Sequence, residues 1–302
     1  MYVGTHLITG AHHDGHDGKA LFFRGSRIWA KTCFITQTLD GVASDAPNSV
    51  AWGDGLVVTF TPGQGMALLP STVRVTMGGT DVTSTAFDFG TRKITLASVT
   101  GDVAIEAIGA EVDAEVEYIE ADGYPRINTG VKVAPTTTFH FEMYINKPNR
   151  VVQPFGGRTA YLSNAMSVAN DARSGGADTA TWYYGNKSQN FTLISEGWHI
   201  FDNTAAANKL TVDNTTVAVT GATMASTNED FFIFTINTGG GSGGNSGGGL
   251  KSKGGKMYSS GTLVRDYIPV RKDGVGYLYD TVTKNLFGNA NSSGAFTYGN
   301  DK

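Results

Sequence analysis

Hydrophobic and polar residues alternate with a period of two along many short segments of this chain. Examples are residues 73–77 (VRVTM), 93–96 (KITL) and 103–108 (VAIEAI), which are separated by turn residues such as those at 61–63 and 78–79. Because successive side chains of a strand point to opposite faces, this pattern predicts strands with one buried and one solvated face. No segment of the sequence combines a sustained period of 3.6 residues with helix caps, so the pattern predicts an all-β protein with little helix.

The pattern divides the chain into units, of which the first is short. Residues 20–29 predict a two-strand hairpin that turns at Gly25 and Ser26, and a single hairpin of this size is not stable alone in water. Residues 1–36 are therefore expected to dock onto another body. Over residues 37–109 the strand-like segments recur at short intervals, which predicts a small β-sandwich.

Residues 110–302 form the largest predicted unit. Its strand-like segments include residues 117–120, 138–145 and 231–236, and a chain of this length with strands and long loops suits a two-sheet jelly roll. Residues 238–249 are rich in glycine and have the composition of a flexible linker. Because β-type sequence resumes after them, they are interpreted as a loop inside this unit.

Composition narrows the classes of function. The 302 residues carry a formal net charge of −4 and only 17% charged residues, so the basic surface that binds nucleic acid is missing. No apolar run is long enough to predict a membrane-spanning helix. The first residues do not have the pattern of a signal peptide, so we expect the protein to leave the cell by lysis, as part of an assembled particle. Cys33 is the only cysteine, which excludes an intrachain disulfide, and its apolar neighbours predict a buried thiol. No cofactor is expected.

Three passages between residues 117 and 298 resemble a known family. The first resembles the opening of concanavalin A-like, laminin-G-type domains in phage structural proteins of the gut Bacteroidales type. The second resembles a strand pair of laminin-G and pentraxin-like domains, with Asn214 in place of the usual glycine. The third resembles the ending of the same phage domains. In chain order, the passages are residues 117–131 (EYIEADGYPRINTGV), residues 198–202 (WHIFD) with 209–214 (KLTVDN), and residues 261–270 (GTLVRDYIPV) with 276–280 (GYLYD) and 284–287 (KNLF).

The earlier part of the chain extends this resemblance. Residues 73–83 and 94–105 resemble a bacterial Ig-like repeat, and residues 19–29 resemble a short segment at the head of such phage proteins. The resemblance implies a tailed-phage virion surface protein with a docking segment (1–36), an Ig-like β-sandwich (37–109) and a concanavalin A-like jelly roll. The docking side chains would be Phe22, Phe23, Arg24 and Trp29.

The function implied by this resemblance is display on the virion surface without catalysis. A head fibre or capsid decoration protein is the first interpretation, and a tail adhesin is the second. A secreted carbohydrate-binding module or a glycoside hydrolase would also be compatible with the sequence. The partners would be other virion proteins, further copies of the chain on the particle, and host-surface or mucosal glycans, to which many weakly binding copies would give avidity.

Sugar recognition needs aromatic rings beside amide or hydroxyl groups. The best local cluster in the sequence lies at residues 182–186. The competing interpretation is that alternate aromatic residues of a strand pack a core. The candidate ligand-binding residues are Trp182, Tyr184, Asn186, Arg158 and Asn164.

Two further motifs carry side chains that suit chemistry. His12, His13 and His16 have the ligand type for zinc, with a polar glycine-rich turn as the competing interpretation. Residues 111–115 read Glu-x-Asp-x-Glu, which places three carboxylates on one face of a strand, as in retaining glycosidases of the jelly-roll type. A solvated acidic connector is the interpretation that we prefer for them. Residues 249–256 have the glycines of a phosphate-binding loop but not its spacing, so nucleotide binding is excluded.

Overall fold

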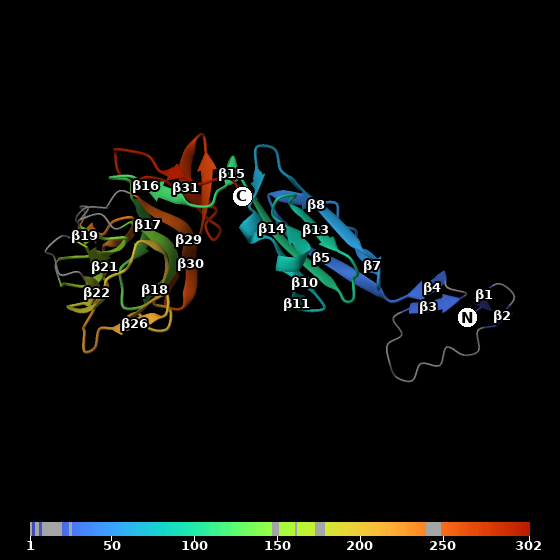
Figure 1. Cartoon of the computed structure of the whole chain (residues 1–302), viewed down its shortest axis with the longest axis horizontal. Helices are drawn as coiled ribbons and strands as arrows, with labels where there is room; N and C mark the ends of the chain where they lie inside the picture. Colours follow the sequence, from blue (N-terminus) through green and yellow to red (C-terminus); the bar gives the residue numbers. More distant parts are fainter. Residues whose placement is uncertain are drawn as a thin grey trace. The chain divides into compact units, whose positions relative to one another are not determined.

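The computed structural model is all-β, as the alternation predicts. It describes residues 2–3, 6–7, 20–23, 26–146, 151–160, 162–172, 179–239 and 249–302, with side chains from residue 31 onward. Within these residues, helix is confined to α1 (Thr83–Ala86) and the single 3-10 turn η1 (Pro70–Thr72). The chain divides into two compact units, Met1–Gly109 and Ala110–Lys302, and strands make up most of both (Figure 1).

The first residues form two small antiparallel pairs. β1 (Tyr2–Val3) pairs with β2 (His6–Leu7), and β3 (Ala20–Phe23) pairs with β4 (Ser26–Ala30). The hairpin predicted for residues 20–29 is therefore confirmed, with Leu21 opposite Trp29. Its docking role stays a prediction, and Arg24 lies outside the described residues. The histidines proposed as zinc ligands, His12, His13 and His16, lie outside them as well.

The rest of the first unit is a sandwich of two sheets. Its core includes Val58, Val75, Ile94 and Ile105, which are fully buried, and Cys33, whose burial raises the pKa of its thiol and confirms the predicted buried thiol. One sheet contains β11 (Thr80–Asp81), β10 (Arg74–Met77), β14 (Val103–Ala110), β5 (Thr32–Asp40) and β7 (Ser49–Ala51), with β9 (Ala67–Leu68) beside β14. The other contains β12 (Phe87–Asp88), β13 (Lys93–Leu96), β8 (Leu56–Pro62) and β6 (Val42–Ser44).

The second unit is a larger two-sheet sandwich. The strands of its eleven-stranded sheet are β26 (Thr215–Ala218), β25 (Lys209–Val212), β24 (Gly197–Asp202), β18 (Thr137–Ile145), β29 (Leu250–Ser259), β30 (Thr262–Lys272), β31 (Val275–Asp280) and β32 (Asn285–Phe287) in spatial order. In addition, β15 (Ala114–Glu115) pairs with β30, and β16 (Ile119–Ala121) pairs with β29 and with β33 (Thr297–Tyr298). The eight-stranded sheet contains β17 (Ile127–Lys132), β27 (Asp230–Ile233), β20 (Phe155–Arg158), β21 (Ala165–Asp171), β22 (Thr179–Gly185) and β23 (Lys187–Thr192) in spatial order, with β19 (Val151–Val152) beside β21 and β28 (Asn237–Thr238) beside β20.

Aromatic side chains from both sheets fill the space between them. Phe139 of β18 has its ring centroid 4.9 Å from that of Phe155 in β20 and 5.4 Å from that of Phe231 in β27. All three are 0% exposed. Edge-to-face and tilted contacts of this kind add to the free energy gained from burying the rings themselves. These contacts hold the two sheets together around one core.

Strand β18 lies in the middle of the eleven-stranded sheet and sets its two faces. Its odd-numbered residues from 137 to 145 are buried, and its even-numbered residues are half-buried. The outward side chains belong to Thr138, His140, Glu142 and Tyr144. The predicted strand at 138–145 is confirmed, and its outer face carries the site described next.

Candidate functional site

Three aromatic side chains meet on the outer face of the eleven-stranded sheet. Tyr144 of β18 lies directly opposite Trp198 of β24, and their ring centroids are 5.6 Å apart. Tyr118, just before β16, has its centroid 5.8 Å from that of Trp198. All three side chains are half-buried, so part of each ring surface reaches solvent. We call Tyr118, Tyr144 and Trp198 the aromatic platform.

Two lysines of β29 lie over these rings. Lys251 Nζ is 4.5 Å from the ring centroid of Tyr118 and 5.4 Å from that of Tyr144. Lys253 Nζ is 4.4 Å from the ring centroid of Trp198. A cation over an aromatic face is attracted by the negative charge of the π-system. The lysines therefore hold the orientation of the platform and place ammonium donors over its rings.

Carboxylates complete the surroundings of the platform. Glu120 lies 3.6 Å from Lys251 Nζ, and Glu142 pairs with Lys253. The Tyr144 hydroxyl donates a hydrogen bond of 2.9 Å to Glu196, and this bond raises the pKa of the phenol. Burial alone would lower the pKa of Lys251, but the attraction of Glu120 and the contact with Tyr118 outweigh it and raise that pKa.

This arrangement brings together apolar ring surface, ammonium donors and carboxylate acceptors. The face of an aromatic ring attracts the slightly positive C–H groups of a sugar ring. Ammonium and carboxylate groups form strong hydrogen bonds with hydroxyls, which both donate and accept. The chemistry of the platform therefore matches a polyhydroxylated ring compound.

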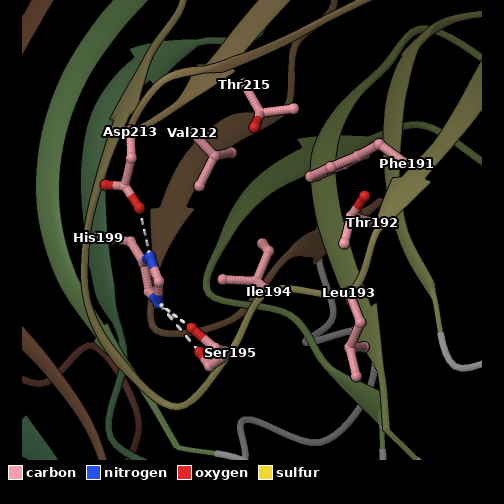
Figure 2. Close-up of a pocket in the computed structure, with 9 residues that line it drawn as sticks. All are labelled: Phe191, Thr192, Leu193, Ile194, Ser195, His199, Val212, Asp213 and Thr215. Atoms are coloured by element: carbon pink, nitrogen blue, oxygen red, sulfur yellow. Dashed lines mark hydrogen bonds and ion pairs between the residues drawn. The ribbon is translucent and has the colours of Figure 1, made fainter.

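A separate pocket lies on the other side of β24. Figure 2 shows Phe191, Thr192 and Leu193 on one side of it and Val212, Asp213 and His199 on the other, with Ser195 below His199. The cavity measures about 160 Å³. Its lining combines the apolar side chains of Phe191, Leu193, Ile194 and Val212 with the polar groups of Thr192, Ser195, His199, Asp213 and Thr215.

The ring of His199 is held at both nitrogens. Nδ1 lies 2.7 Å from Oδ2 of Asp213, and Nε2 lies 2.9 Å from the backbone oxygen of Ser195. Both neighbours are acceptors, so each contact is a hydrogen bond when the ring nitrogen that faces it carries hydrogen. Burial alone would raise the pKa of Asp213, but hydrogen bonds from the Ile200 N–H and from His199 lower it below the usual value.

Ser195, His199 and Asp213 have the residue types of a nucleophile, base and acid, but not the geometry. The Ser195 hydroxyl is 3.5 Å from His199 Nε2, whereas the backbone oxygen of Ser195 is 2.9 Å from it. The hydroxyl therefore lies beyond the roughly 2.6–3.2 Å that joins a nucleophile to its base, and the nearer partner of Nε2 is the backbone oxygen. We call the contacts of His199 with Ser195 and Asp213 the clasp, because they join β24 to the segment before it and to the turn after β25.

The structure does not assemble the ligand-binding cluster that the sequence suggested. Trp182 is 0% exposed, and its Nε1 donates to the backbone oxygen of Asn208, so the prediction of ligand contact there is wrong. Tyr184 is on the same inward face and 8% exposed, and burial raises the pKa of its phenol. In both cases alternation along β22 points the ring into the core, as the competing interpretation held.

The remaining three candidates are apart from the platform. Asn164 and Asn186 use their side-chain oxygens to accept hydrogen bonds from the backbone of Ala225 and Thr223, so they hold a loop. Arg158 lies half-buried at the end of β20, in the opposite sheet. We assign none of them to the platform.

The acidic motif at residues 111–115 is engaged in ion pairs. Asp113 accepts a hydrogen bond of 3.0 Å from Arg271, and the buried Glu115 accepts one of 2.9 Å from Lys302. These bonds join β15 and the preceding turn to β30 and to the last residues of the sequence. The carboxylates therefore fasten chain segments together, with Glu111 exposed beside them.

Metal-binding clusters and membrane-spanning helices are both absent from the part of the chain that the structure describes. Those residues contain no group of three or more His, Cys, Asp or Glu side chains arranged to hold a metal ion. None of the helices among them is long and apolar enough to cross a membrane.

Sequence reasoning missed the platform, although it noted Trp198 as part of a strand pair. Tyr118, Tyr144 and Trp198 come from three segments, and only strand pairing brings them together. One signal was present in the sequence. Lys251 and Lys253 are two residues apart, which places both on one face of a strand.

The fold and the platform define a class, an all-β sandwich protein with an outward aromatic surface edged by charged groups. No family model matches the chain, and no curated protein matches it. Among solved structures, it is similar to the crystal structure of a "putative carbohydrate binding protein" from Bacteroides ovatus ATCC 8483, with 12% sequence identity and a TM-score of 0.38. The similarity covers 89% of this chain and 98% of that chain.

Proposed function

We propose that this protein is a non-catalytic carbohydrate-binding protein and that the aromatic platform is its glycan-binding surface. One observation carries the proposal. Tyr118, Tyr144 and Trp198 form a half-exposed aromatic cluster with the ammonium groups of Lys251 and Lys253 over its rings. Apolar ring faces beside strong hydrogen-bonding groups are the combination that a sugar ring requires.

The packing explains why these rings are available to a ligand. The core of the unit is already filled by other aromatic residues, such as Phe139 and Trp182. Trp198 and Tyr144 point to the opposite face of their strands, where they contact each other and the lysines. Glu120 and Glu142 hold the two lysines, and Glu196 holds Tyr144. The surface is therefore ordered before a ligand arrives, which reduces the entropy lost on binding.

The site of action in this proposal is the surface of a phage particle. The similarity of the passages between residues 117 and 298 to phage structural domains supports it, as does the paired hairpin β3–β4 near the start of the chain. A head fibre or capsid decoration protein is the first form of the proposal, and a tail adhesin is the second. Many copies on one particle would convert weak glycan contacts into firm attachment. A secreted carbohydrate-binding module would use the same platform.

A glycan array with the full chain tests the binding proposal. The wild type and the Tyr124→Ala variant are expected to bind the same glycans, because Tyr124 is an exposed aromatic residue (74%) outside the platform. The Trp198→Ala and Tyr144→Ala variants are expected to bind them at least about tenfold more weakly, since one stacked ring contributes on the order of 1 kcal/mol or more. Circular dichroism checks that all variants are folded.

Two results would overturn the proposal. One is a wild-type protein that binds no glycan on the array, and the other is a Trp198→Ala variant that binds as tightly as the wild type. The same glycans also test the absence of catalysis. Release of reducing ends by the wild type, lost when Glu111 and Glu115 are both changed to Gln, would establish a hydrolase instead.

The particle location has its own test. Deletion of residues 1–30, which leaves strand β5 (Thr32–Asp40) of the sandwich intact, is expected to prevent incorporation into particles while leaving glycan binding unchanged, because the platform is built entirely from residues after position 110. Normal incorporation of the shortened chain would contradict the docking role of the first segment.

A further inference from the structure

Polar side chains continue beyond the aromatic platform on the same face of the sheet. His140 is the outward residue four positions before Tyr144 on β18, and its Nδ1 lies 2.7 Å from Oδ2 of Asp202 in β24. On its other side His140 lies opposite Lys256 of β29, which in turn lies opposite Asp266 of β30. The Nζ of Lys256 is 3.6 Å from Asp266. We call Asp202, His140, Lys256 and Asp266 the distal row.

The distal row reaches solvent. The side chains of His140 and Lys256 are 45% and 48% exposed. Between this row and the platform lie the Glu142–Lys253 ion pair and Ile200, which is 43% exposed although it is apolar. One continuous surface therefore runs along β18, with aromatic rings at one end, an ion pair and an apolar side chain in the middle, and a polar row at the other end.

The length of this surface indicates the size of its ligand. Four residues along an antiparallel strand span about 14 Å, which is roughly the length of three linked sugar rings. A single sugar on the platform would leave the distal row without contact. An oligosaccharide lying along the strand would cover both ends.

The charges along the surface indicate the chemistry of the ligand. Asp266 and Glu142 are each balanced by a lysine, Lys256 and Lys253, and Asp202 is hydrogen-bonded to the ring of His140. A strongly charged polymer would need unbalanced charges of the opposite sign. Hydroxyl groups need none, because they accept hydrogen bonds from ammonium groups and donate them to carboxylates. A neutral saccharide chain therefore fits this surface better than a charged polymer does.

We infer that the ligand is an extended oligosaccharide of at least three sugar residues that lies parallel to β18, with one end on the aromatic platform and the other on the distal row. This inference rests on the proposed carbohydrate-binding function and specifies its substrate class. His140 and Asp202 then contribute to affinity only for ligands long enough to reach them.

Calorimetric titration with saccharides of increasing length tests the inference. The probes are cello-oligosaccharides and chito-oligosaccharides of two to six residues, which are straight, neutral chains. The wild-type affinity is expected to rise about tenfold between the disaccharide and the trisaccharide or tetrasaccharide and then to level off, since one added charged hydrogen bond contributes a factor of this size.

The variants separate the two ends of the surface. His140→Ala is expected to return the tetrasaccharide affinity to that of the disaccharide and to leave the disaccharide affinity unchanged. Asp202→Asn, a milder change, should act in the same direction. Trp198→Ala should weaken all lengths alike. Gln189→Ala, on the exposed strand β23 of the other sheet, is the matched control and should change none.

The outcomes distinguish the failure of the inference from the failure of the proposed function. Affinity that does not depend on length overturns the inference, and so does an equal loss for disaccharide and tetrasaccharide in His140→Ala. Binding on the array to branched or single terminal sugars alone, with neither oligosaccharide series bound, also overturns it but leaves the proposed function intact. If no saccharide of any kind is bound, the proposed function falls and the inference falls with it.

Discussion

Nδ1 of His199 lies 2.7 Å from Oδ2 of Asp213, which joins the middle of β24 to the turn between β25 and β26. The same ring holds the backbone oxygen of Ser195 at 2.9 Å. Trp198 of the platform and Glu196, which accepts the hydrogen bond from Tyr144, lie in this segment between Ser195 and His199. The contacts of His199 on one face of β24 therefore hold the backbone from which Trp198 projects on the other face.

Replacing Asp213 by Asn should destabilise the second unit. The change removes the negative charge that faces the imidazole, and we expect a loss of about 1 kcal/mol in the free energy of unfolding, since the carboxylate is 46% exposed and partly screened by solvent. Urea unfolding followed by tryptophan fluorescence measures it. Asp122→Asn, at an exposed position, serves as the control. Equal unfolding midpoints for both variants would show that the clasp contributes nothing.

The carboxylates of Asp202 and Asp213 should make the free energy of unfolding fall in acid. Burial works to raise the pKa of Asp202, but hydrogen bonds with Thr204 and His140 lower it, and Asp213 is lowered in a similar way. A carboxylate whose pKa is lower when folded stabilises the protein above its unfolded pKa of about 3.9. That contribution is lost as the pH falls through the lower, folded pKa.

The double variant Asp202→Asn/Asp213→Asn should therefore lose less stability than the wild type between about pH 4 and pH 2. Urea unfolding at intervals of half a pH unit gives the two curves. Parallel curves over this range would mean that neither carboxylate is responsible for the acid sensitivity.

Two tryptophans of the second unit should behave in opposite ways. Trp182 is 0% exposed in the core, so Trp182→Ala should cost about 3–5 kcal/mol of unfolding free energy through the cavity that it leaves. Trp198 is half-buried on the sheet surface, and Trp198→Ala should cost only about 1 kcal/mol. Thermal and urea unfolding of both variants provides the comparison. A larger loss for Trp198 would contradict the assignment of the two rings.

The glycines at 254 and 255 should be required by the backbone and not by a ligand. Gly254 has a φ of +92°, and a Cβ there would lie 2.1 Å from the backbone oxygen of Tyr267. Gly254→Ala is therefore expected to cost about 2 kcal/mol or more. Gly274 also has a positive φ, +74°, but open space around it, so Gly274→Ala should cost only about 1 kcal/mol.

Unfolding measurements on these two variants separate steric contact from backbone strain. Equal losses would mean that the contact with Tyr267 is relieved by movement of the neighbouring strand. The glycines at residues 249–256 are the ones that, in the sequence, have some likeness to a phosphate-binding loop. A large loss for Gly254→Ala would show that the backbone requires this glycine. In the structure this segment is an irregularity in the pairing of β18 with β29.

Much of the local structure could be predicted from residue alternation. The segment at 138–145 became β18, the hairpin at 20–29 became β3 and β4, and the neighbours of Cys33 correctly indicated a buried thiol. Alternation works because it depends only on the geometry of one strand. It shows which residues share a face, but not which face becomes the core.

The error at Trp182 and the omission of Tyr144 have this same cause. Trp182 and Tyr184 share a face, and so do Glu142 and Tyr144, but only the packing of the second sheet decides that the first pair is buried and the second is not. Residue type does not distinguish the two cases, because aromatic rings suit a core and a sugar-binding surface equally well.

Residue alternation predicts the all-β class, the position of several strands and the pairs of residues that share a face, because these follow from the geometry of the backbone near each residue. Only the folded chain brings Tyr118, Tyr144 and Trp198 together, places Asp213 beside His199, and gives Asp113 and Glu115 their basic partners. These contacts join residues that are distant in the sequence. They depend on which strands pair and in what register, and no short segment of the chain contains that information.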